Sequence, residues 1–279
     1  MGETIQYISD QRTPLVSVIM SVYNGDKYLK DAIDSICNQT YTHWEYIIID
    51  DGSNDLTQSI LEKYKEDKRF IITRNEIREG LTKNLNKAIQ IAKGSLMARM
   101  DADDISLSNR FQEQVDYLLC YPRVSLVATF IDMINEKNAV IGAWRDDRSA
   151  STYQKIKKKL PFSNCIAHPS VMIRKEVFLN LKYNEFQKNA EDWDLWMQMV
   201  NHKFIIEKIP KTLLLYRVHD ASITQVSLKA SSFFKKNMAY KLYFKNLKST
   251  EKFTWFNVKV RMAFCVNKMK LFLSKLKRK

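Results

Sequence analysis

Three carboxylates stand within four residues of this chain, at Asp101, Asp103 and Asp104. They follow an apolar-rich segment, 95–100, that is typical of a β-strand. Ionised carboxylates this close repel one another and are costly to desolvate, so packing alone does not explain them. A divalent cation such as Mg²⁺ or Mn²⁺ would remove both costs, because it prefers carboxylate oxygens and completes its shell with phosphate oxygens of a substrate. The alternative is an acidic turn that caps the following helix.

Two further clusters could hold a nucleotide. The segment Asp50-Asp51-Gly52-Ser53 follows a second apolar strand, and a carboxylate there can accept the N3–H of a uracil ring or contact ribose hydroxyls. The alternative is an ordinary Asp-Gly turn, in which glycine permits the tight bend. A helical pattern begins at Gly80, and its first N–H groups, with Lys83 and Arg78, would face a phosphate. The other interpretation of that segment is a helix start with a solvated lysine.

The second half of the chain offers groups for acid–base chemistry. Glu191 and Asp192 precede a helix with an apolar face over 193–200. A carboxylate at a helix N-terminus is held ionised by the helix dipole and could act as a general base on a hydroxyl. Simple helix capping is the alternative. His219 follows a strand beside Arg217, which could contact a diphosphate.

His168 is followed by proline and serine, and a lone histidine fits a structural role better than a ligating one.

Strand and helix signals alternate through the first half of the chain, where they must position these groups. Strands are predicted at 15–22, 46–49, 70–73 and 95–100, and helices at 28–37, 56–64 and 80–92. This alternation predicts an α/β fold with a parallel sheet, in which ligands collect at the carboxyl ends of the strands. The turn at Asn24, the Asp50-Asp51 pair and the acidic run all fall at such ends, so the three clusters are expected on one rim.

The pattern is less regular beyond the acidic run. A helix is predicted around 111–119, a strand over 124–134, a loop or helix over 149–159, a strand over 170–173, and two strands, 204–209 and 212–218, around a turn at Pro210.

The composition is that of an ordinary globular protein. The 279 residues are 45% hydrophobic, which allows one large α/β domain with or without an appendage. The four cysteines form no CxxC pair, which argues against a zinc site or a disulfide framework and is typical of a reducing compartment. We expect neither a signal peptide nor a membrane span, because no segment has the required apolar run.

The net charge of +14 is concentrated at one end of the chain. Residues 228–279 hold 15 of the 45 Lys and Arg residues and a single acid, Glu251, whereas the rest of the chain holds 30 bases and 30 acids. In this tail, apolar and aromatic residues recur at steps of three and four over 255–276, with basic residues between them. The pattern predicts a helix lying on an anionic bilayer. The alternatives are a helix that packs its apolar face on the domain, and, less compatible with the neutral body, a nucleic-acid site.

With these motifs in hand, the chain resembles the family 2 inverting glycosyltransferases of the GT-A fold, in the bacterial branch that builds O-antigen and capsule repeat units. The resemblance runs from about Leu15 to about Thr224. The motifs that carry it occur in the family's order: 16–24, Asp50-Asp51-Gly52-Ser53, Gly80-Leu81-Thr82, Met100-Asp101-Ala102-Asp103-Asp104, His168-Pro169-Ser170, Glu191-Asp192 and Tyr216-Arg217-Val218-His219.

The resemblance implies a role for each matching residue. Asp192 would be the catalytic base, with Glu191 beside it near the acceptor. Mn²⁺ or Mg²⁺ would be held by Asp103 and Asp101, the family's DxD pair, and by His219. The residues expected to hold the nucleotide sugar are Asn24, Asp50, Asp51, Gly80, Lys83, Asp101, Ala102 and Arg217. Many members carry an Arg-Asn pair where this chain has Leu85-Asn86, so Lys83 or Arg78 would have to supply that diphosphate contact.

The resemblance also implies a fold, a domain division and an activity. Residues 1–227 would form a GT-A (Rossmann-like) domain with a mostly parallel sheet, and 228–279 a basic helical tail. The enzyme would transfer a hexose or N-acetylhexosamine from a UDP-sugar to a hydroxyl of a saccharide, lipid-linked through undecaprenyl diphosphate. It would act in the cytoplasm at the inner face of the bacterial plasma membrane, with no nucleic-acid partner. A nucleotidyltransferase and a non-catalytic scaffold of the same fold remain as alternatives.

Overall fold

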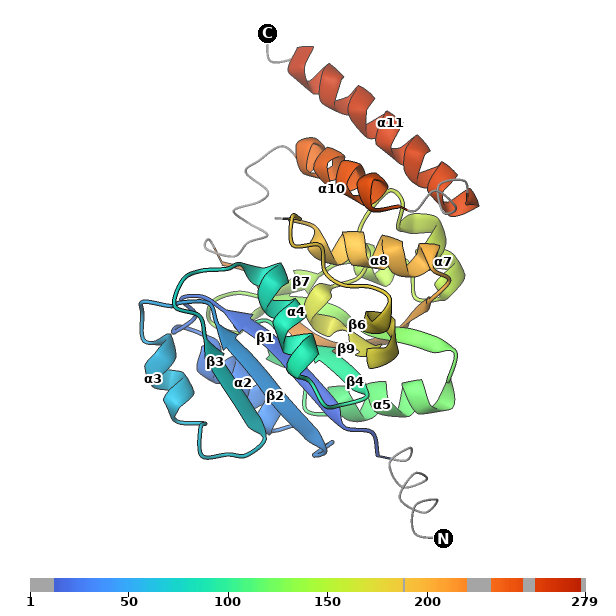
Figure 1. Cartoon of the computed structure of the whole chain (residues 1–279). Helices are drawn as coiled ribbons and strands as arrows, with labels where there is room; N and C mark the ends of the chain where they lie inside the picture. Colours follow the sequence, from blue (N-terminus) through green and yellow to red (C-terminus); the bar gives the residue numbers. More distant parts are fainter. Residues whose placement is uncertain (1–12, 188, 220–231, 248–253, 277–279) are drawn as a thin grey trace.

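A computed structural model describes residues 13–187, 189–219, 232–247 and 254–276 (Figure 1). Its strands are β1 Val16–Val22, β2 Trp44–Asp50, β3 Phe70–Arg74, β4 Leu96–Arg99, β5 Ile105–Ser106, β6 Val124–Ile134, β7 Val140–Ala143, β8 Met172–Arg174 and β9 Ile205–Arg217. Its α-helices are α2 Leu29–Cys37, α3 Thr57–Glu62, α4 Leu81–Ile91, α5 Arg110–Cys120, α6 Arg145–Arg148, α7 Tyr153–Lys159, α8 Glu191–Asn201, α10 Ser232–Asn246 and α11 Trp255–Leu276, and two 3₁₀ turns are η1 His168–Ser170 and η2 Lys175–Leu179.

The strands of the described residues form one nine-stranded sheet. Its order is β3-β2-β1-β4-β8-β6-β9-β5, and β7 pairs with β6 outside this path. The four strands predicted in the first half are all parallel, as expected. All seven residues of β2 are buried, which is typical of a parallel strand covered on both faces. The parallel strands therefore end on one rim, where the acidic turn after β4 lies.

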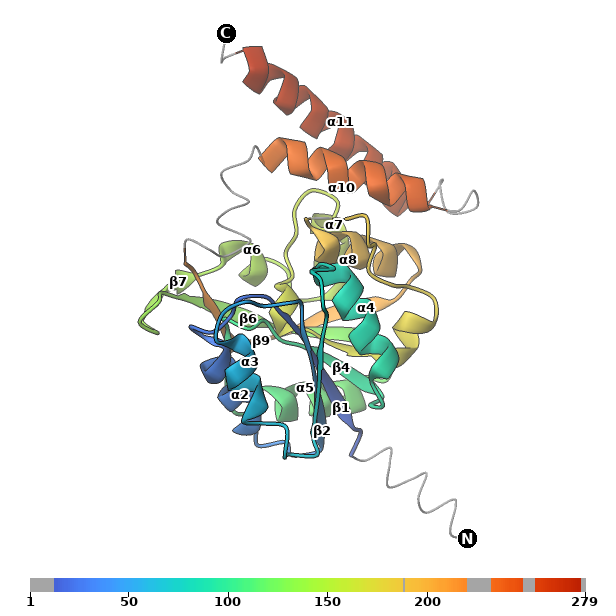
Figure 2. The same ribbon diagram turned by 60° about the vertical axis from the view of Figure 1, so that its left-hand side comes forward.

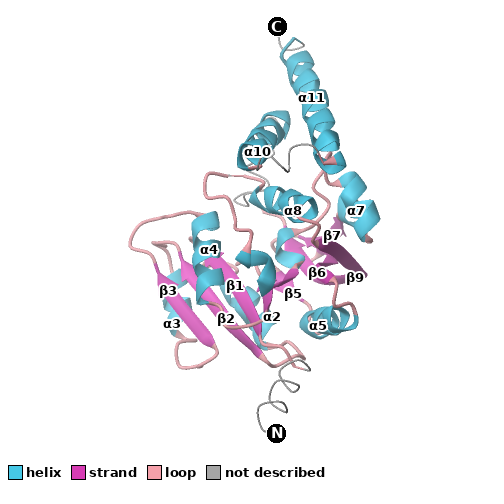
Figure 3. Ribbon diagram, turned by 45° about the vertical axis from the view of Figure 1, so that its right-hand side comes forward, coloured by secondary structure: helices cyan, strands magenta, loops and turns pink. Residues whose placement is uncertain are grey.

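Two hydrophobic cores cover the two faces of the sheet. Along β1, Val16, Val18 and Met20 point into a core with α2 and α5, whereas Ile19 points into a core with α4 and α8. This alternation is the two-residue period of a strand. Figures 1 and 3 show α4 and α8 on one side of the sheet and α2 and α5 on the other.

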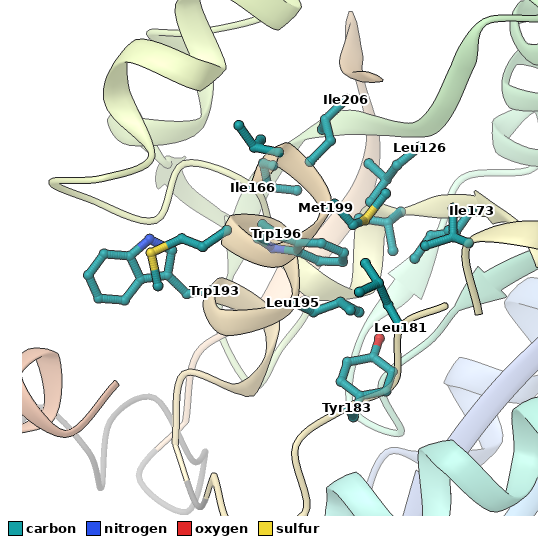
Figure 4. Packing of buried hydrophobic residues seen from close by; sticks show 14 of the residues in the cluster. Leu126, Ile166, Ile173, Leu181, Tyr183, Trp193, Leu195, Trp196, Met199 and Ile206 are labelled. Carbon is teal, nitrogen blue, oxygen red and sulfur yellow. The ribbon is translucent and has the colours of Figure 1, made fainter. Parts of the chain in front are cut away.

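Helix α8 is the centre of one core. Trp196 is fully buried, and Figure 4 shows its ring pointing into the cluster near Leu126 and Met199, whereas Trp193 points out of the opposite side of the helix. The indole N–H of Trp193 donates to the carbonyl oxygen of Leu160 at 2.7 Å, so its polar atom is satisfied although the ring is buried. The start of α8, which carries two of the predicted site residues, is thus fixed by packing on both sides.

The structure corrects one sequence prediction in the second half of the chain. The two strands expected around a turn at Pro210 are one strand, β9, which runs parallel to β6 with register shifts near Thr129 and Phe130. Proline lacks an N–H, but an irregular position of a strand does not need that donor, so Pro210 is accommodated without a turn. The segment expected as a loop or helix over 149–159 contains α7.

Helices α10 and α11 stack on α8 and extend the same core (Figure 2). The ring of Tyr240 meets that of Trp193 edge-on at 5.2 Å. The side-chain amide of Asn257 donates to Asn201 Oδ1, at the end of α8, at 2.9 Å. One face of the predicted helical tail therefore packs on the domain. None of the helices in the described ranges is both long and apolar enough to cross a bilayer.

Candidate active site

A cavity of about 390 Å³ opens where the acidic turn after β4 faces the start of α8. Its walls come from segments far apart in the sequence, brought together by the sheet. The lining residues are Leu81, Arg99, Asp101, Asp103, Ile131, Met133, Trp144, Asn164, Ile166, Ala167, His168, Pro169, Asn189, Ala190, Glu191, Asp192 and Tyr216. Four residues predicted from motifs about 90 residues apart, Asp101, Asp103, Glu191 and Asp192, therefore share one site.

The three aspartates of the acidic turn lie in different environments. Asp101 accepts a hydrogen bond from Arg99 Nη2 at 2.5 Å. The Oδ2 atom of Asp103 lies 3.0 Å from His219 Nε2. Asp104 is buried, and its Oδ1 accepts the backbone N–H of Arg217 at 2.9 Å. Only Asp101 and Asp103 line the cavity, so Asp104 belongs to the support of the turn.

Burial makes this turn electrostatically costly. It raises the pKa of Asp101, with the charge of Asp103 adding to the effect and Arg99 opposing it. Burial likewise raises the pKa of Asp104 well above its usual range. The Arg99 side chain is itself buried, and its Nε and Nη1 have no hydrogen-bond partner among the described residues. A buried guanidinium that lines the cavity with two nitrogens unpaired is a ready donor for an anionic group.

The donor set of the acidic turn fits a divalent cation that is shared with a substrate. Asp101 and Asp103 offer carboxylate oxygens, which suit Mn²⁺ or Mg²⁺, and the imidazole of His219 lies beside Asp103. In the described part of the chain no three His, Cys, Asp or Glu side chains are grouped so that they could hold a metal ion by themselves. A cation held here would therefore take its remaining ligands from phosphate oxygens and water, as Mg²⁺ commonly does.

The start of α8 presents two carboxyl groups to the cavity. Asp192 Oδ2 accepts a hydrogen bond from Asn164 Nδ2 at 2.6 Å. Burial raises the pKa of Asp192 to about 6, and burial together with the charge of Asp192 raises the pKa of Glu191 to about 7. Desolvation thus outweighs the stabilisation expected from the helix dipole, and the Asp192 carboxyl group is ionised only above about pH 6. Both are poised to exchange protons near neutral pH.

His168 is a buried, neutral group behind these carboxyls. Its Nε2 lies 2.7 Å from the hydroxyl of Tyr183, and its Nδ1 lies 4.0 Å from Glu191 Oε1. Burial lowers the pKa of His168 well below its usual value, and the nearby positive charge of Arg99 adds to this. The histidine is therefore an uncharged neighbour of Glu191, at a distance too long for a hydrogen bond.

The residues predicted on the β1 and β2 ends form a neighbouring web outside the cavity lining. The backbone N–H of Asn24 donates to Ser53 Oγ at 2.9 Å, and the Asn24 side chain accepts the N–H of Asn54 at 3.0 Å. Asp50 is buried, and its Oδ1 accepts the N–H of Ser53 at 2.9 Å. These contacts tie the two strand ends together and fix the shape of the rim.

Asp51 organises the loop that leads into α4. Its carboxylate accepts the N–H groups of Glu79 and Gly80 at 2.8 and 2.9 Å and the side-chain amide of Asn75 at 2.9 Å. Burial acts to raise the pKa of Asp51, but hydrogen bonds, with Asn84 first among them, outweigh it and lower the pKa. Asp51 is therefore a stable anion that holds this loop in place.

The other predicted nucleotide-binding residues have distinct positions. Gly80 has φ +97°, a conformation that side chains rarely adopt, and begins α4. Lys83 is exposed on the first turn of α4. The guanidinium of Arg78 lies 3.9 Å from the centre of the Tyr23 ring. Ala102 packs against the core beneath the acidic turn.

Arg217 differs most from its prediction as a diphosphate contact. Its side chain is 1% exposed, and the guanidinium donates to the carbonyl oxygens of Asp103 at 2.7 Å and Asn135 at 3.1 Å. It is absent from the cavity lining. Arg217 thus fastens the acidic turn to the β6–β7 connection, although its Nη2 has no hydrogen-bond partner among the described residues, and a contact with the diphosphate stays a prediction.

Sequence reasoning missed much of the cavity wall. Trp144, Met133 and Tyr216 line it, yet aromatic and apolar residues in or beside strands look the same as core residues in a sequence. Arg99 had a usable signal, because a charged residue at the end of an apolar strand and next to an acidic run needs a partner.

Comparisons with known proteins agree with this geometry. The family model described as glycosyl transferase family 2 matches residues 17–181. The O-antigen biosynthesis glycosyltransferase WbnJ of Escherichia coli is 37% identical over 218 residues, covering 77% of this chain and 84% of WbnJ.

Two solved structures share the fold. S. aureus TarS 1–349 in complex with UDP-GlcNAc superposes with a TM-score of 0.64 at 18% identity, over 85% of this chain and 69% of that one. The mannosyltransferase PcManGT of Pyrobaculum calidifontis, in complex with GDP-Man and Mn²⁺, has a TM-score of 0.65 at 14% identity, over 95% of this chain and 82% of that one. The expected GT-A fold is confirmed.

Proposed function

Because the chain belongs to glycosyl transferase family 2 and is a glycosyltransferase, we propose that it moves a hexose or N-acetylhexosamine from a UDP-sugar to a saccharide hydroxyl, with inversion at the anomeric carbon. The observation that carries the proposal is the convergence of Asp101 and Asp103 with Asp192 in one cavity. The first two are suited to the diphosphate end of a donor, and the third to the acceptor.

In the proposed mechanism Asp192 is the general base. The acceptor hydroxyl gives its proton to the Asp192 carboxylate while its oxygen attacks the anomeric carbon from the face opposite UDP. Asn164 Nδ2 donates to Asp192 Oδ2 at 2.6 Å and the backbone N–H of Trp193 donates to Oδ1 at 2.7 Å, so both oxygens are held in place and the proton is taken by a remaining lone pair. Direct displacement requires no enzyme nucleophile, and a single displacement inverts the anomeric centre.

The opposite side of the cavity is proposed to hold the donor. Asp103, Asp101 and His219 would hold Mn²⁺ or Mg²⁺, which supplies neutralisation of the charge that develops on the departing UDP. Arg99, which lines the cavity and whose Nε and Nη1 have no partner among the described residues, would donate to the same anionic group. The uridine is assigned to the rim built by Asn24, Asp50 and Asp51, with Gly80, Ala102, Lys83 and Arg78 lining the approach to the phosphates.

The acceptor is proposed to be a saccharide linked to lipid through undecaprenyl diphosphate, as part of surface polysaccharide synthesis. Similarity to an O-antigen biosynthesis enzyme supports this assignment. Such an acceptor places the reaction at the cytoplasmic face of the plasma membrane, with the enzyme bound peripherally. Membership of the glycosyl transferase family favours this activity over nucleotidyl transfer.

The decisive experiment compares purified full-length wild type with Asp192→Asn. We expect the variant to lose turnover of the best donor in a UDP-sugar panel with Mn²⁺ by about 10²–10⁴-fold, the usual contribution of a general base. Its affinity for UDP, measured by calorimetry, should stay the same, because Asp192 lies on the acceptor side. The matched control is Asp31→Asn, which changes an exposed carboxylate on α2. Retained turnover in Asp192→Asn would refute the assignment of the base.

A further inference from the structure

The outer face of α11 carries a continuous row of exposed apolar side chains. Trp255 is 84% exposed and Phe272 is 63% exposed, at the two ends of the row. The complete row consists of Trp255, Val258, Met262, Val266, Met269, Phe272 and Leu273, hereafter the outer strip. Successive members are three or four positions apart, except for the adjacent pair Phe272 and Leu273, so they share one side of the helix.

The opposite face of α11 already satisfies the packing needs of the helix. Phe256, Val260 and Ala263 are buried in the core shared with α8 and α10. Asn267 Nδ2 donates to Asn237 Oδ1 of α10 at 2.8 Å, which fixes the rotation of the helix. One apolar stripe is enough for a helix that covers a domain. The outer strip therefore needs another explanation, because a contiguous exposed apolar patch of this kind usually marks an interaction site.

The charges on α11 identify the partner of the outer strip. Lys259, Arg261, Lys268 and Lys270 are exposed on this helix, and its sequence contains no Asp or Glu. Arg261 and Lys268 lie 4.9 and 4.5 Å from the ring centres of Phe244 and Phe264, which keeps both cations on the flanks of the helix. An apolar strip bordered by cations alone is complementary to an anionic lipid surface.

We propose that α11 docks on an anionic bilayer through the outer strip, lying in the plane of the headgroups. The apolar side chains insert at the acyl boundary, Trp255 sits at the interfacial level that tryptophan prefers, and the lysines contact lipid phosphates. A second copy of the chain is a poorer partner, because a face flanked only by Lys and Arg would meet the same charges. The proposal goes beyond the enzymatic activity and does not depend on it.

The docked helix is joined rigidly to the candidate active site. Tyr240 of α10 packs on Trp193, one residue after Asp192, and donates to the carbonyl oxygen of Pro161 at 2.7 Å. Asn257 of α11 bonds to Asn201 at the far end of α8. Helix α8 is therefore held at both ends by the two helices that would lie next to the membrane, which Figure 1 shows stacked in the order α8, α10, α11. Binding at the membrane then sets the height of the cavity above it.

The test uses the full chain with vesicles of phosphatidylcholine alone or with 30% phosphatidylglycerol. We expect sedimentation with the anionic vesicles and at least tenfold weaker binding to the neutral ones, since each basic residue near an anionic surface contributes roughly fivefold. Trp255 provides an internal probe, because it is 84% exposed, whereas Trp44, Trp193 and Trp196 are buried and Trp144 is partly buried in the wall of the cavity. Its emission should shift to the blue on binding, and Trp255→Phe should remove most of that shift.

Two sets of variants separate the apolar and the charged contributions. Met262→Gln/Met269→Gln/Phe272→Gln and Lys259→Glu/Lys270→Glu should each weaken binding to anionic vesicles at least tenfold. The matched controls change exposed residues elsewhere, Leu56→Gln/Leu119→Gln/Leu179→Gln and Lys63→Glu/Lys93→Glu, and should leave binding unchanged. All of these side chains are exposed, so the fold should survive, as circular dichroism would verify.

Three results would overturn the proposal. The first is equal binding to neutral and anionic vesicles. The second is unchanged emission of the wild-type protein with anionic vesicles, a measurement that needs no variant to fold. The third is a dimer, seen by sedimentation velocity without lipid, that the triple glutamine variant abolishes; a second copy would then be the occupant of the outer strip.

Discussion

At the scale of single residues, the carboxyl groups at the start of α8 should make the turnover rate depend on pH. Asp192 must be ionised to accept a proton, and burial raises its pKa to about 6. We therefore expect kcat at saturating donor and acceptor to fall as the pH decreases through about 6, with Glu191 and Asp192 titrating as a pair. A rate that stays constant between pH 5 and pH 8 would contradict this expectation.

The same burial has a consequence for stability. In an unfolded chain an aspartate ionises near pH 3.9, so the folded protein binds the Asp192 proton more tightly than the unfolded one. The ionised side chain therefore costs stability, a cost that is absent below about pH 4 and fully present above about pH 6. Asp192→Asn should stabilise the protein by about 1–2 kcal/mol at pH 8 and by less at pH 5.

Urea unfolding at the two pH values measures this difference. Asp31→Asn is the control, because an exposed carboxylate should change the free energy of unfolding by less than about 0.5 kcal/mol at either pH. Equal effects of Asp192→Asn at pH 5 and pH 8 would show that the carboxyl group is not desolvated.

At the scale of elements, the loop between α4 and β4 passes close to the backbone at the start of β1, with Gly94 at the contact. The N–H of Gly94 donates to Ser17 Oγ at 2.8 Å. A Cβ at this position would overlap the carbonyl oxygen of Leu15 and lie 2.8 Å from the backbone N of Ser17. Gly94→Ala should therefore destabilise the protein by about 1–3 kcal/mol, the usual cost of overpacking. Thermal unfolding measures it, with the exposed neighbour Lys93→Ala as control; a Tm equal to that of wild type would mean that β1 moves freely at this point.

Helices and strands could be predicted where apolar residues recur in the sequence at a clear helical or strand spacing. The run 15–22 and the helical spacing at 28–37 each correspond to an element, β1 and α2, because local pattern and burial agree. The two-residue strand β5 was not predictable, since it exists only by pairing with β9, more than 100 residues away. The turn expected at Pro210 was wrong for the same reason: the pairing of β9 with β6 decides the local structure.

Some residues of the candidate site could likewise be predicted from the sequence, and others could not. Its acidic residues could be predicted, because clustered carboxylates are conspicuous in a sequence. The positions of Arg217 and Asp51 could not, because only the folded chain shows whether a charged group faces a ligand or is used by the protein. The raised pKa of Asp192 also depends on tertiary burial, which sequence spacing does not report.

At the scale of the whole molecule, the described helices of the tail, α10 and α11, contribute side chains to the hydrophobic core. Tyr240, Tyr243 and Val260 are fully buried in the cluster that contains Trp193. Truncation after residue 227 should therefore expose this cluster and lower the free energy of unfolding by about 3 kcal/mol or more. Chemical denaturation of the two chains is the measurement. A truncated chain as stable as the full one would support the sequence-based division at residue 227.

The position of β9 between β6 and β5 has a consequence for synthesis of the protein. During synthesis, Ile105 and Ser106 have no strand partner until residues 214–215, more than 100 positions later in the chain, have emerged from the ribosome. The acidic turn next to them is completed only when Arg217 has also emerged. The acidic turn of a nascent chain therefore lacks this support until β9 has been synthesised and has paired with β5.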